Sequence, residues 1–128
     1  MTGVQTCALP ISTLHETWHD ARLDGVAPQR VGLVVGGSNF QQRDAYLMQQ
    51  AHGAQPWFMR PSHGHAFMDS DLTALCTEVF GIRGFAWTVG AASASGQVAV
   101  LQAIDAVACG RVDACIALGA LKIGRAHV

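Results

Sequence analysis

Charged residues are scarce in this chain. Only 13% of the 128 residues are Asp, Glu, Lys or Arg, and the formal net charge at pH 7 is −1. A surface without excess positive charge gains little by binding phosphates, so we expect no nucleic-acid partner and no binding to an anionic membrane. Half of the residues are apolar, which excludes a disordered chain. The composition therefore predicts one folded domain that buries much of its surface.

Long apolar runs and closely paired cysteines are also absent. No apolar stretch reaches the roughly 18 residues that span a bilayer, so we expect a cytoplasmic protein with no membrane partner. Four cysteines, at positions 7, 76, 109 and 115, form no Cys-x-x-Cys pair and lie mostly within apolar runs. This usage is typical of reduced, buried thiols rather than of a disulfide framework or a zinc knuckle.

The two ends of the chain are related at the level of DNA. Residues 6–11 (TCALPI) and residues 123–128 (IGRAHV) can be encoded by one string read on its two strands, which is typical of a translated sequencing adapter. Segments of this kind are set aside before the fold is considered. We therefore expect adapter-derived artefacts at residues 1–12 and 122–128 and a partial domain at residues 13–121.

Between these ends, apolar strand-like segments alternate with helical ones. The expected strands, apolar and rich in β-branched or aromatic residues, are residues 30–37, 85–89 and 112–119. The expected helices are residues 13–24, 39–52, 70–80 and 94–109. Gly81 is placed to end the third helix in a left-handed conformation. The fourth is apolar on nearly every side and is expected to be buried. This order predicts an α/β fold with helices on both faces of a largely parallel sheet.

Residues 53–66 break this alternation. They contain two prolines and two glycines, which predict an ordered loop. Trp57, Phe58 and Met59 form an aromatic and apolar cluster within it, and we expect this cluster to pack the loop against the core.

Residues 88–96, TVGAASASG, fall at the predicted turn from a strand into the apolar helix. Small residues let the backbone turn sharply and let a ligand approach the first turn of the helix. Ser93 would lie on this elbow, where unpaired N–H groups and the positive end of the helix dipole favour developing negative charge. A structural alternative is that the small residues permit close packing of helix on sheet, with Ser93 or Ser95 as the N-cap. The residues alone leave both interpretations open.

Residues 85–120, FAWTVGAASASGQVAVLQAIDAVACGRVDACIALGA, resemble the active-site region of the β-ketoacyl synthases of the thiolase superfamily, a family of acyltransferases. Upstream, RVGLVVGGS is similar to that family's early core strand and FGIRG to the approach to its nucleophile strand. The resemblance implies a thiolase-like layered fold, with helices covering a mostly parallel mixed sheet, of which this chain is the N-terminal half only. It also implies a homodimer paired through the strand at residues 85–89, an acyl carrier protein as partner, and no cofactor or metal.

In this resemblance the family's nucleophilic cysteine falls on Ser93. A thiol with a pKa of about 8.5 supplies some thiolate at neutral pH, whereas a hydroxyl supplies essentially none, so condensation is expected to fail. Decarboxylation of a malonyl thioester requires that an enolate oxygen be stabilised, which backbone N–H groups and the family's downstream histidines can do without a covalent intermediate. The resemblance therefore gives Ser93 two roles: it occupies the nucleophile position, and its backbone N–H is a donor of the oxyanion hole.

The serine and the FMDSD segment at residues 67–71 resemble the decarboxylating, serine-bearing members of the family in polyketide biosynthesis. That resemblance implies that the full-length protein converts malonyl to acetyl groups on acyl carrier protein. A non-catalytic partner subunit, similar to a chain-length factor, is the alternative. The family's two histidines and lysine fall beyond residue 121, and their state decides between the two. The fragment itself is expected to be inactive and to expose apolar surface.

Two histidine pairs suggest a more remote alternative, a zinc hydrolase. His15, Glu16 and His19 fit the His-Glu-x-x-His pattern, in which two imidazoles one helical turn apart bind zinc. No spacing in the chain points to a third ligand. His63 and His65 form a second pair, for which a solvated loop is the alternative.

Overall fold

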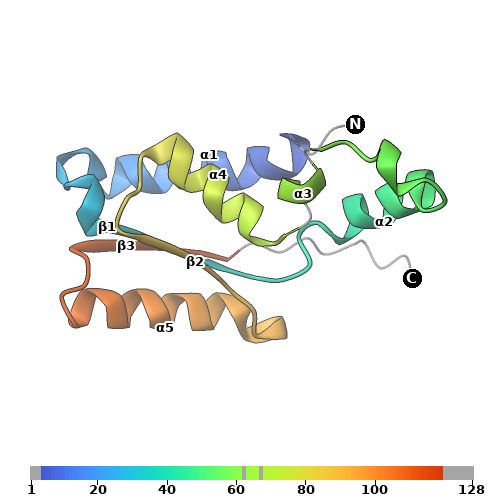
Figure 1. Cartoon of the computed structure of the whole chain (residues 1–128). Helices are drawn as coiled ribbons and strands as arrows, with labels where there is room; N and C mark the ends of the chain where they lie inside the picture. Colours follow the sequence, from blue (N-terminus) through green and yellow to red (C-terminus); the bar gives the residue numbers. More distant parts are fainter. Residues whose placement is uncertain (1–3, 62, 67, 120–128) are drawn as a thin grey trace.

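A three-stranded parallel sheet runs through the middle of the molecule (Figure 1). The computed structural model describes residues 4–61, 63–66 and 68–119, with side chains from residue 10 onward apart from residues 65 and 66. The strands are β1 (Val31–Gly36), β2 (Phe85–Val89) and β3 (Ala114–Gly119), in the order β2-β1-β3. Both pairings are parallel. All three predicted strands are therefore confirmed, with ends that differ by at most two residues.

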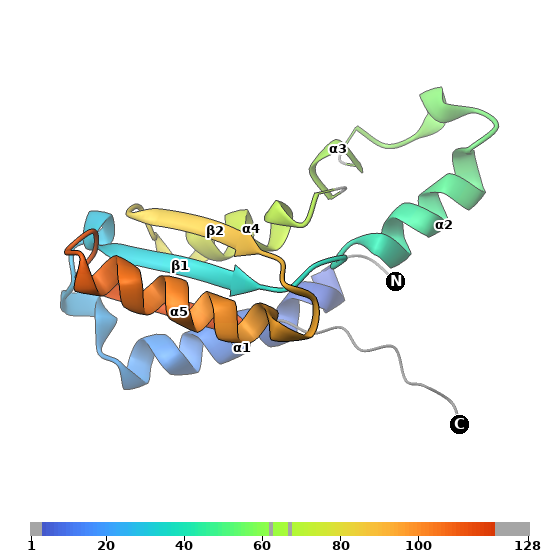
Figure 2. The ribbon, with the colours of Figure 1, turned by 90° about the horizontal axis from the view of Figure 1, so that it is seen from below.

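Helices cover both faces of this sheet. Helices α1 (Val4–Asp20) and α4 (Ser70–Phe80) lie on one face, and α5 (Ser95–Ala108) lies on the other (Figure 1). Helix α2 (Gln42–His52) projects beyond the sheet, and the short α3 (His63–Ala66) lies between it and α4 (Figure 2). Four 3-10 helices complete the described elements: Leu23–Gly25, Pro28–Arg30, Pro56–Phe58 and Ala92–Ala94. The predicted α/β layered fold is confirmed.

Strand β1 is buried along its whole length. Because side chains alternate along a strand, Leu33 and Val35 face the α1 and α4 side and join a core cluster that contains Leu14 and Cys76. The other face of β1 carries Gly32, Val34 and Gly36. Helix α5 presents small buried residues to the sheet, Ala99, Ala103 and Ala106 among them. Small residues on both sides allow the helix and the sheet to approach closely.

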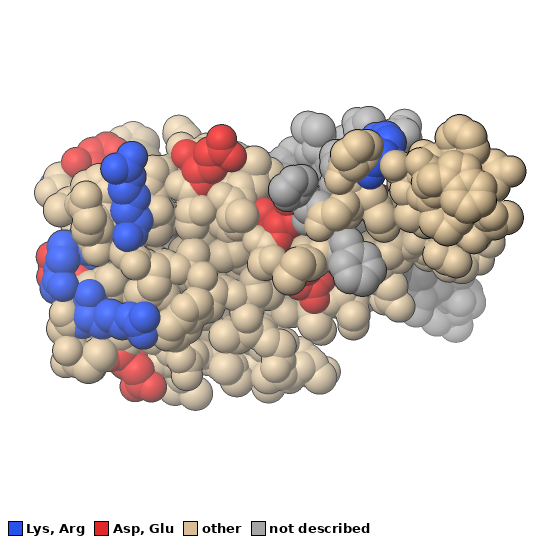
Figure 3. All heavy atoms as spheres, in the orientation of Figure 1, with Lys and Arg blue, Asp and Glu red and all other residues tan. Residues whose placement is uncertain are grey.

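The prediction that α5 is buried on every side is wrong for its outer face. Val100, Leu101, Ile104 and Val107 are between 42% and 60% exposed. Within the described residues only the sheet packs against α5, so a helix that is apolar all round keeps one face uncovered. The expected exposed apolar surface is therefore present on α5. Figure 3 shows Lys and Arg side chains gathered mostly at the left end of the face drawn, with few charged side chains along its lower edge.

The apolar cluster of residues 57–59 also departs from its prediction. Trp57 is 75% exposed and Phe58 63% exposed, and their ring centroids lie 6.3 Å apart. They contact each other rather than the core because this segment lies at the end of the arm that begins with α2 (Figure 2). Met59 is half-buried.

The cysteines were predicted to be buried, and the structure corrects one of them. Cys76 is fully buried in α4, whereas Cys109 is exposed because it follows the last turn of α5. Cys115 is half-buried, and this burial raises the pKa of its thiol. The side chain of Cys7 lies outside those that the structure describes.

Gly81 ends α4 as predicted, with a left-handed φ of 65°. None of the helices in the described part of the chain has the length and hydropathy of a segment that crosses a bilayer.

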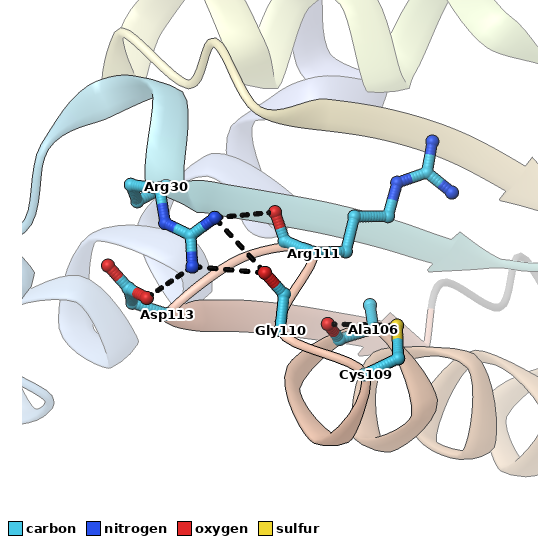
Figure 4. Close-up of polar contacts among 6 residues, drawn as sticks. All are labelled: Arg30, Ala106, Cys109, Gly110, Arg111 and Asp113. Atoms are coloured by element: carbon cyan, nitrogen blue, oxygen red, sulfur yellow. Dashed lines mark hydrogen bonds and ion pairs between the residues drawn. The ribbon is translucent and has the colours of Figure 1, made fainter.

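Arg30 fastens the start of β1 to the turn between α5 and β3 (Figure 4). Its guanidinium donates hydrogen bonds to the carbonyl oxygens of Gly110 and Arg111, at 3.0 to 3.1 Å, and to the Asp113 carboxylate at 2.6 Å. The hydrogen bond with Arg30 lowers the pKa of Asp113 and raises the pKa of Arg30. Two carbonyls and one carboxylate therefore share a single cation.

We expect Arg30→Ala to lower the melting temperature more than Asp113→Ala, because only the arginine also binds two carbonyl groups. The Asp113 pKa is lowered by folding, so the stabilisation by this ion pair is complete above the usual aspartate pKa and is lost as the pH falls below it. The ion pair is solvent-exposed, so the effect of Asp113→Ala is expected to shrink with added salt. Thermal melts of both variants at low and high salt measure these losses of melting temperature. The same loss for the two variants, or a loss for Asp113→Ala that does not change with salt, would contradict the prediction.

Candidate functional site

The chain turns sharply between the end of β2 at Val89 and the start of α5 at Ser95 (Figure 2). Ala92 has a φ of 46°, a left-handed conformation that residues with a Cβ adopt rarely. Ser93 follows it within the 3-10 turn Ala92–Ala94, and its side chain is exposed. Ser93 therefore lies on a strand-to-helix elbow, at the head of a helix that packs on the sheet.

Ser95 closes this elbow from the inside. Its Oγ accepts a hydrogen bond from the Ala91 N–H at 2.8 Å and donates one to the Ala92 carbonyl at 2.7 Å. The Ser95 N–H donates to the same carbonyl. The side chain is 3% exposed. These bonds involve neither the N–H nor the hydroxyl of Ser93.

The interpretation of Ser93 or Ser95 as a helix cap is wrong. The N-cap of α5 is Ala94, which makes no side-chain capping bond. The Ser95 hydroxyl points back along the chain to residues 91 and 92 instead of forward to the first turn of the helix. The N-terminus of α5 therefore begins without a side-chain cap, and its dipole faces the elbow.

Close packing of the helix on the sheet is nevertheless real at this point. A Cβ on Gly36, at the end of β1, would lie 2.3 Å from the carbonyl oxygen of Ser95. A Cβ on Gly119, at the end of β3, would lie 3.9 Å from the Cα of Gly96. The small residues thus serve packing as well as the turn.

Asp69 joins the loop after β1 to the start of α4, and sequence reasoning missed this role. Its carboxylate accepts hydrogen bonds from the N–H groups of Asn39, at 2.7 Å, and Phe40, at 2.8 Å. Asp69 is the N-cap residue of α4, but its side chain makes no capping bond to its own helix. Its partners lie about 30 positions earlier in the chain, and no local pattern indicates them.

Two threonines extend this connection toward the elbow. The hydroxyls of Thr73, on α4, and Thr88, on β2, lie 2.6 Å apart, and Thr88 also donates to the Asp69 carbonyl at 3.5 Å. The Gly37 N–H donates to the carbonyl of Val89 at 2.9 Å. The described part of the FMDSD segment therefore lies against the strand that leads into the elbow.

The histidine pairs do not form a metal centre in the part of the chain that the structure describes. His15, Glu16 and His19 lie on α1 with exposed side chains. Among the described residues, no three His, Cys, Asp or Glu side chains come together in a way that could hold a metal ion. His63 lies on α3, and the side chain of His65 is outside those described. The zinc-hydrolase alternative therefore lacks the third ligand that it requires.

Comparison with known proteins places the chain in a family. Residues 4–126 match the family described as the beta-ketoacyl synthase N-terminal domain, and the chain belongs to this family. It is 55% identical over 109 residues to the polyketide biosynthesis malonyl-ACP decarboxylase PksF of Bacillus subtilis, which covers 85% of the chain. It is also 34% identical over 113 residues, 80% of the chain, to a Streptomyces halstedii protein named as a polyketide beta-ketoacyl synthase. In each case the chain spans 26% of the length of the relative.

We expect Gly36→Ala to destabilise the protein by about 1 to 3 kcal/mol, because the new methyl group would meet the backbone of Ser95 and push α5 away from β1. Gly25→Ala is the matched control, since a Cβ there has no atom within 4 Å. Urea denaturation of both variants measures the difference. A Gly36→Ala variant as stable as Gly25→Ala would show that the helix moves away at no cost.

Proposed function

We propose that the full-length protein removes carbon dioxide from malonyl groups on acyl carrier protein and leaves acetyl groups, as a step of polyketide biosynthesis in the cytoplasm. The observation that carries the proposal is a hydroxyl, rather than a thiol, on the elbow of a chain that is 55% identical to a malonyl-ACP decarboxylase. Ser93 takes the family's nucleophile position in this proposal.

The reaction requires stabilisation of negative charge rather than a covalent intermediate. The bond between the carboxylate carbon and the α-carbon breaks, carbon dioxide leaves, and the electron pair moves onto the thioester as an enolate. A proton then adds to the α-carbon to give the acetyl thioester. The Ser93 N–H and the positive end of the α5 dipole are the groups of this chain that favour the enolate oxygen. The exposed Ser93 side chain and the absence of a side-chain cap on α5 support this role.

The Ser93 hydroxyl itself is not expected to accept the acyl group. A hydroxyl is essentially un-ionised at neutral pH, and a nucleophilic serine requires a strong base beside it. No titratable side chain appears among the hydrogen bonds that close the elbow. Acyl transfer would therefore be slow, and decarboxylation would proceed without it.

Acyl carrier protein is the proposed carrier of the substrate, and the protein is proposed to act as a homodimer. Strand β2 lies at one edge of the described sheet. An edge strand leaves one row of its N–H and C=O groups free of partners in the sheet, and a second copy could pair with that row.

The function is tested by incubating the complete gene product with malonyl-loaded acyl carrier protein and following loss of carbon dioxide by mass spectrometry. The protein used omits residues 1–12 and 122–128, which we propose are adapter-derived. We expect acetyl-loaded carrier protein to accumulate much faster than in buffer. No acceleration would exclude the enzyme and favour a non-catalytic partner subunit that shapes the cavity of an active synthase.

Ser93→Cys is expected to gain acyl transfer. A thiol at the head of a helix has a lowered pKa and supplies thiolate at neutral pH. The variant should become labelled by an acyl thioester probe, whereas the parent protein and Ser93→Ala should not. Intact-mass analysis after incubation with the probe measures this. An unlabelled Ser93→Cys variant would show that residue 93 is not in the nucleophile position.

A further inference from the structure

Ser95 is buried, fully hydrogen-bonded and separated by one residue from Ser93, yet the proposed chemistry does not use it. Its Oγ joins the Ala91 N–H to the Ala92 carbonyl, and its own N–H donates to that same carbonyl. One residue therefore makes three hydrogen bonds to the two residues that precede Ser93. We propose that Ser95 is a positioning residue for the reaction at Ser93, an inference that rests on the proposed decarboxylation.

Ala92 has a strained backbone conformation, with a φ of 46°. A left-handed conformation at a residue with a Cβ persists only where the surroundings enforce it. The Ala92 carbonyl receives both the hydroxyl and the N–H of Ser95. These bonds fix the peptide plane between Ala92 and Ser93, and that plane sets the direction of the Ser93 N–H.

Ser95 is itself held in place by the sheet. Its carbonyl oxygen lies against Gly36, so closely that a Cβ there would come within 2.3 Å of it. Gly36 ends β1, which is buried along its whole length and paired on both sides. Ser95 therefore links the elbow, through its hydroxyl, to β1, which its carbonyl oxygen contacts at Gly36. The position of β1 in this way fixes the direction of the Ser93 N–H.

The Ser95 hydroxyl bonds in an unusual direction for a serine at the start of a helix. A serine at the head of a helix usually accepts a hydrogen bond from the N–H groups of the first turn and so satisfies them. The Ser95 hydroxyl bonds backward instead, and Ala94 makes no capping bond. Ser95 thus braces the elbow without using the helix N-terminus that would stabilise the enolate.

The kinetic test compares Ser95→Ala and Ser95→Thr in the complete gene product with malonyl-loaded acyl carrier protein. Loss of the hydroxyl should lower kcat about tenfold to a hundredfold with KM nearly unchanged, because a slightly misdirected donor weakens the transition state more than substrate binding. Ser95→Thr keeps the hydroxyl and should restore most of kcat. If Ser95→Ala does not accumulate, Ser95→Cys replaces it, because a thiol of similar size forms only weak hydrogen bonds.

Arg30→Ala is the control for a merely structural effect. Arg30 lies just before the start of β1, at the opposite end of that strand from Gly36 and the elbow, and its side chain bonds residues 110, 111 and 113. Arg30→Ala should lower the melting temperature, as Ser95→Ala does, and leave kcat unchanged. Equal kcat values for the parent protein and Ser95→Ala would overturn the proposal.

A second readout separates this inference from the proposed function. In the Ser93→Cys background, the pH profile of thiol alkylation by iodoacetamide reports how well the elbow stabilises negative charge at residue 93. Adding Ser95→Ala should raise the pKa of the introduced thiol, and adding Ser95→Thr should not. If the pKa shifts but the parent protein does not decarboxylate malonyl-ACP, the proposed function fails and the positioning role stands. An unchanged alkylation profile overturns the positioning role.

Discussion

The contact between the first turn of α5 and the end of β1 determines where the elbow lies. Gly36 has no side chain, so the Ser95 carbonyl rests directly on the strand backbone. Further along the interface, Ala99 and Ala103 are buried against the same face. Because β1 is buried and paired on both sides, its position is fixed, and the first turn of α5 is positioned by its contact with it. The position of Ser93 then depends on only a few residues of backbone between β2 and α5.

Two local preferences are broken at this elbow. Ala92 is left-handed, although glycine or asparagine would adopt that conformation at lower cost. Ala94 occupies the N-cap, where Ser, Thr, Asp or Asn would stabilise the helix by about 1 kcal/mol. A turn selected for stability alone would use those residues. The missing cap is shared with α2 and α4, whereas strained backbone such as that of Ala92 clusters at sites where the backbone binds something.

The sequence predicted the strands, the elbow and the end of α4, because each depends on a local pattern: an apolar run, a stretch of small residues, a glycine after a helix. The prediction that α5 is buried on every side was wrong, since Leu101 and Ile104 are exposed. An apolar side chain can be covered by a neighbour, but the sequence does not show that a neighbour is there. The prediction that Trp57 packs against the core was wrong for the same reason. The hydrogen bonds of Asp69 to Asn39 and Phe40, and those of Ser95 to residues 91 and 92, depend on three-dimensional geometry that no periodicity encodes.

The elbow does not depend on the side chain of residue 93. Its hydrogen bonds come from Ala91, Ala92 and Ser95, and its packing comes from Gly36. In the proposed function, exchange of a thiol for a hydroxyl at residue 93 therefore leaves the backbone donors and the helix dipole in place, while it removes the thiolate that acyl transfer would require. One backbone geometry can then support two outcomes. Under the proposed function, a thiol at residue 93 would let the site carry an acyl group, and a hydroxyl would leave the stabilisation of negative charge that decarboxylation requires.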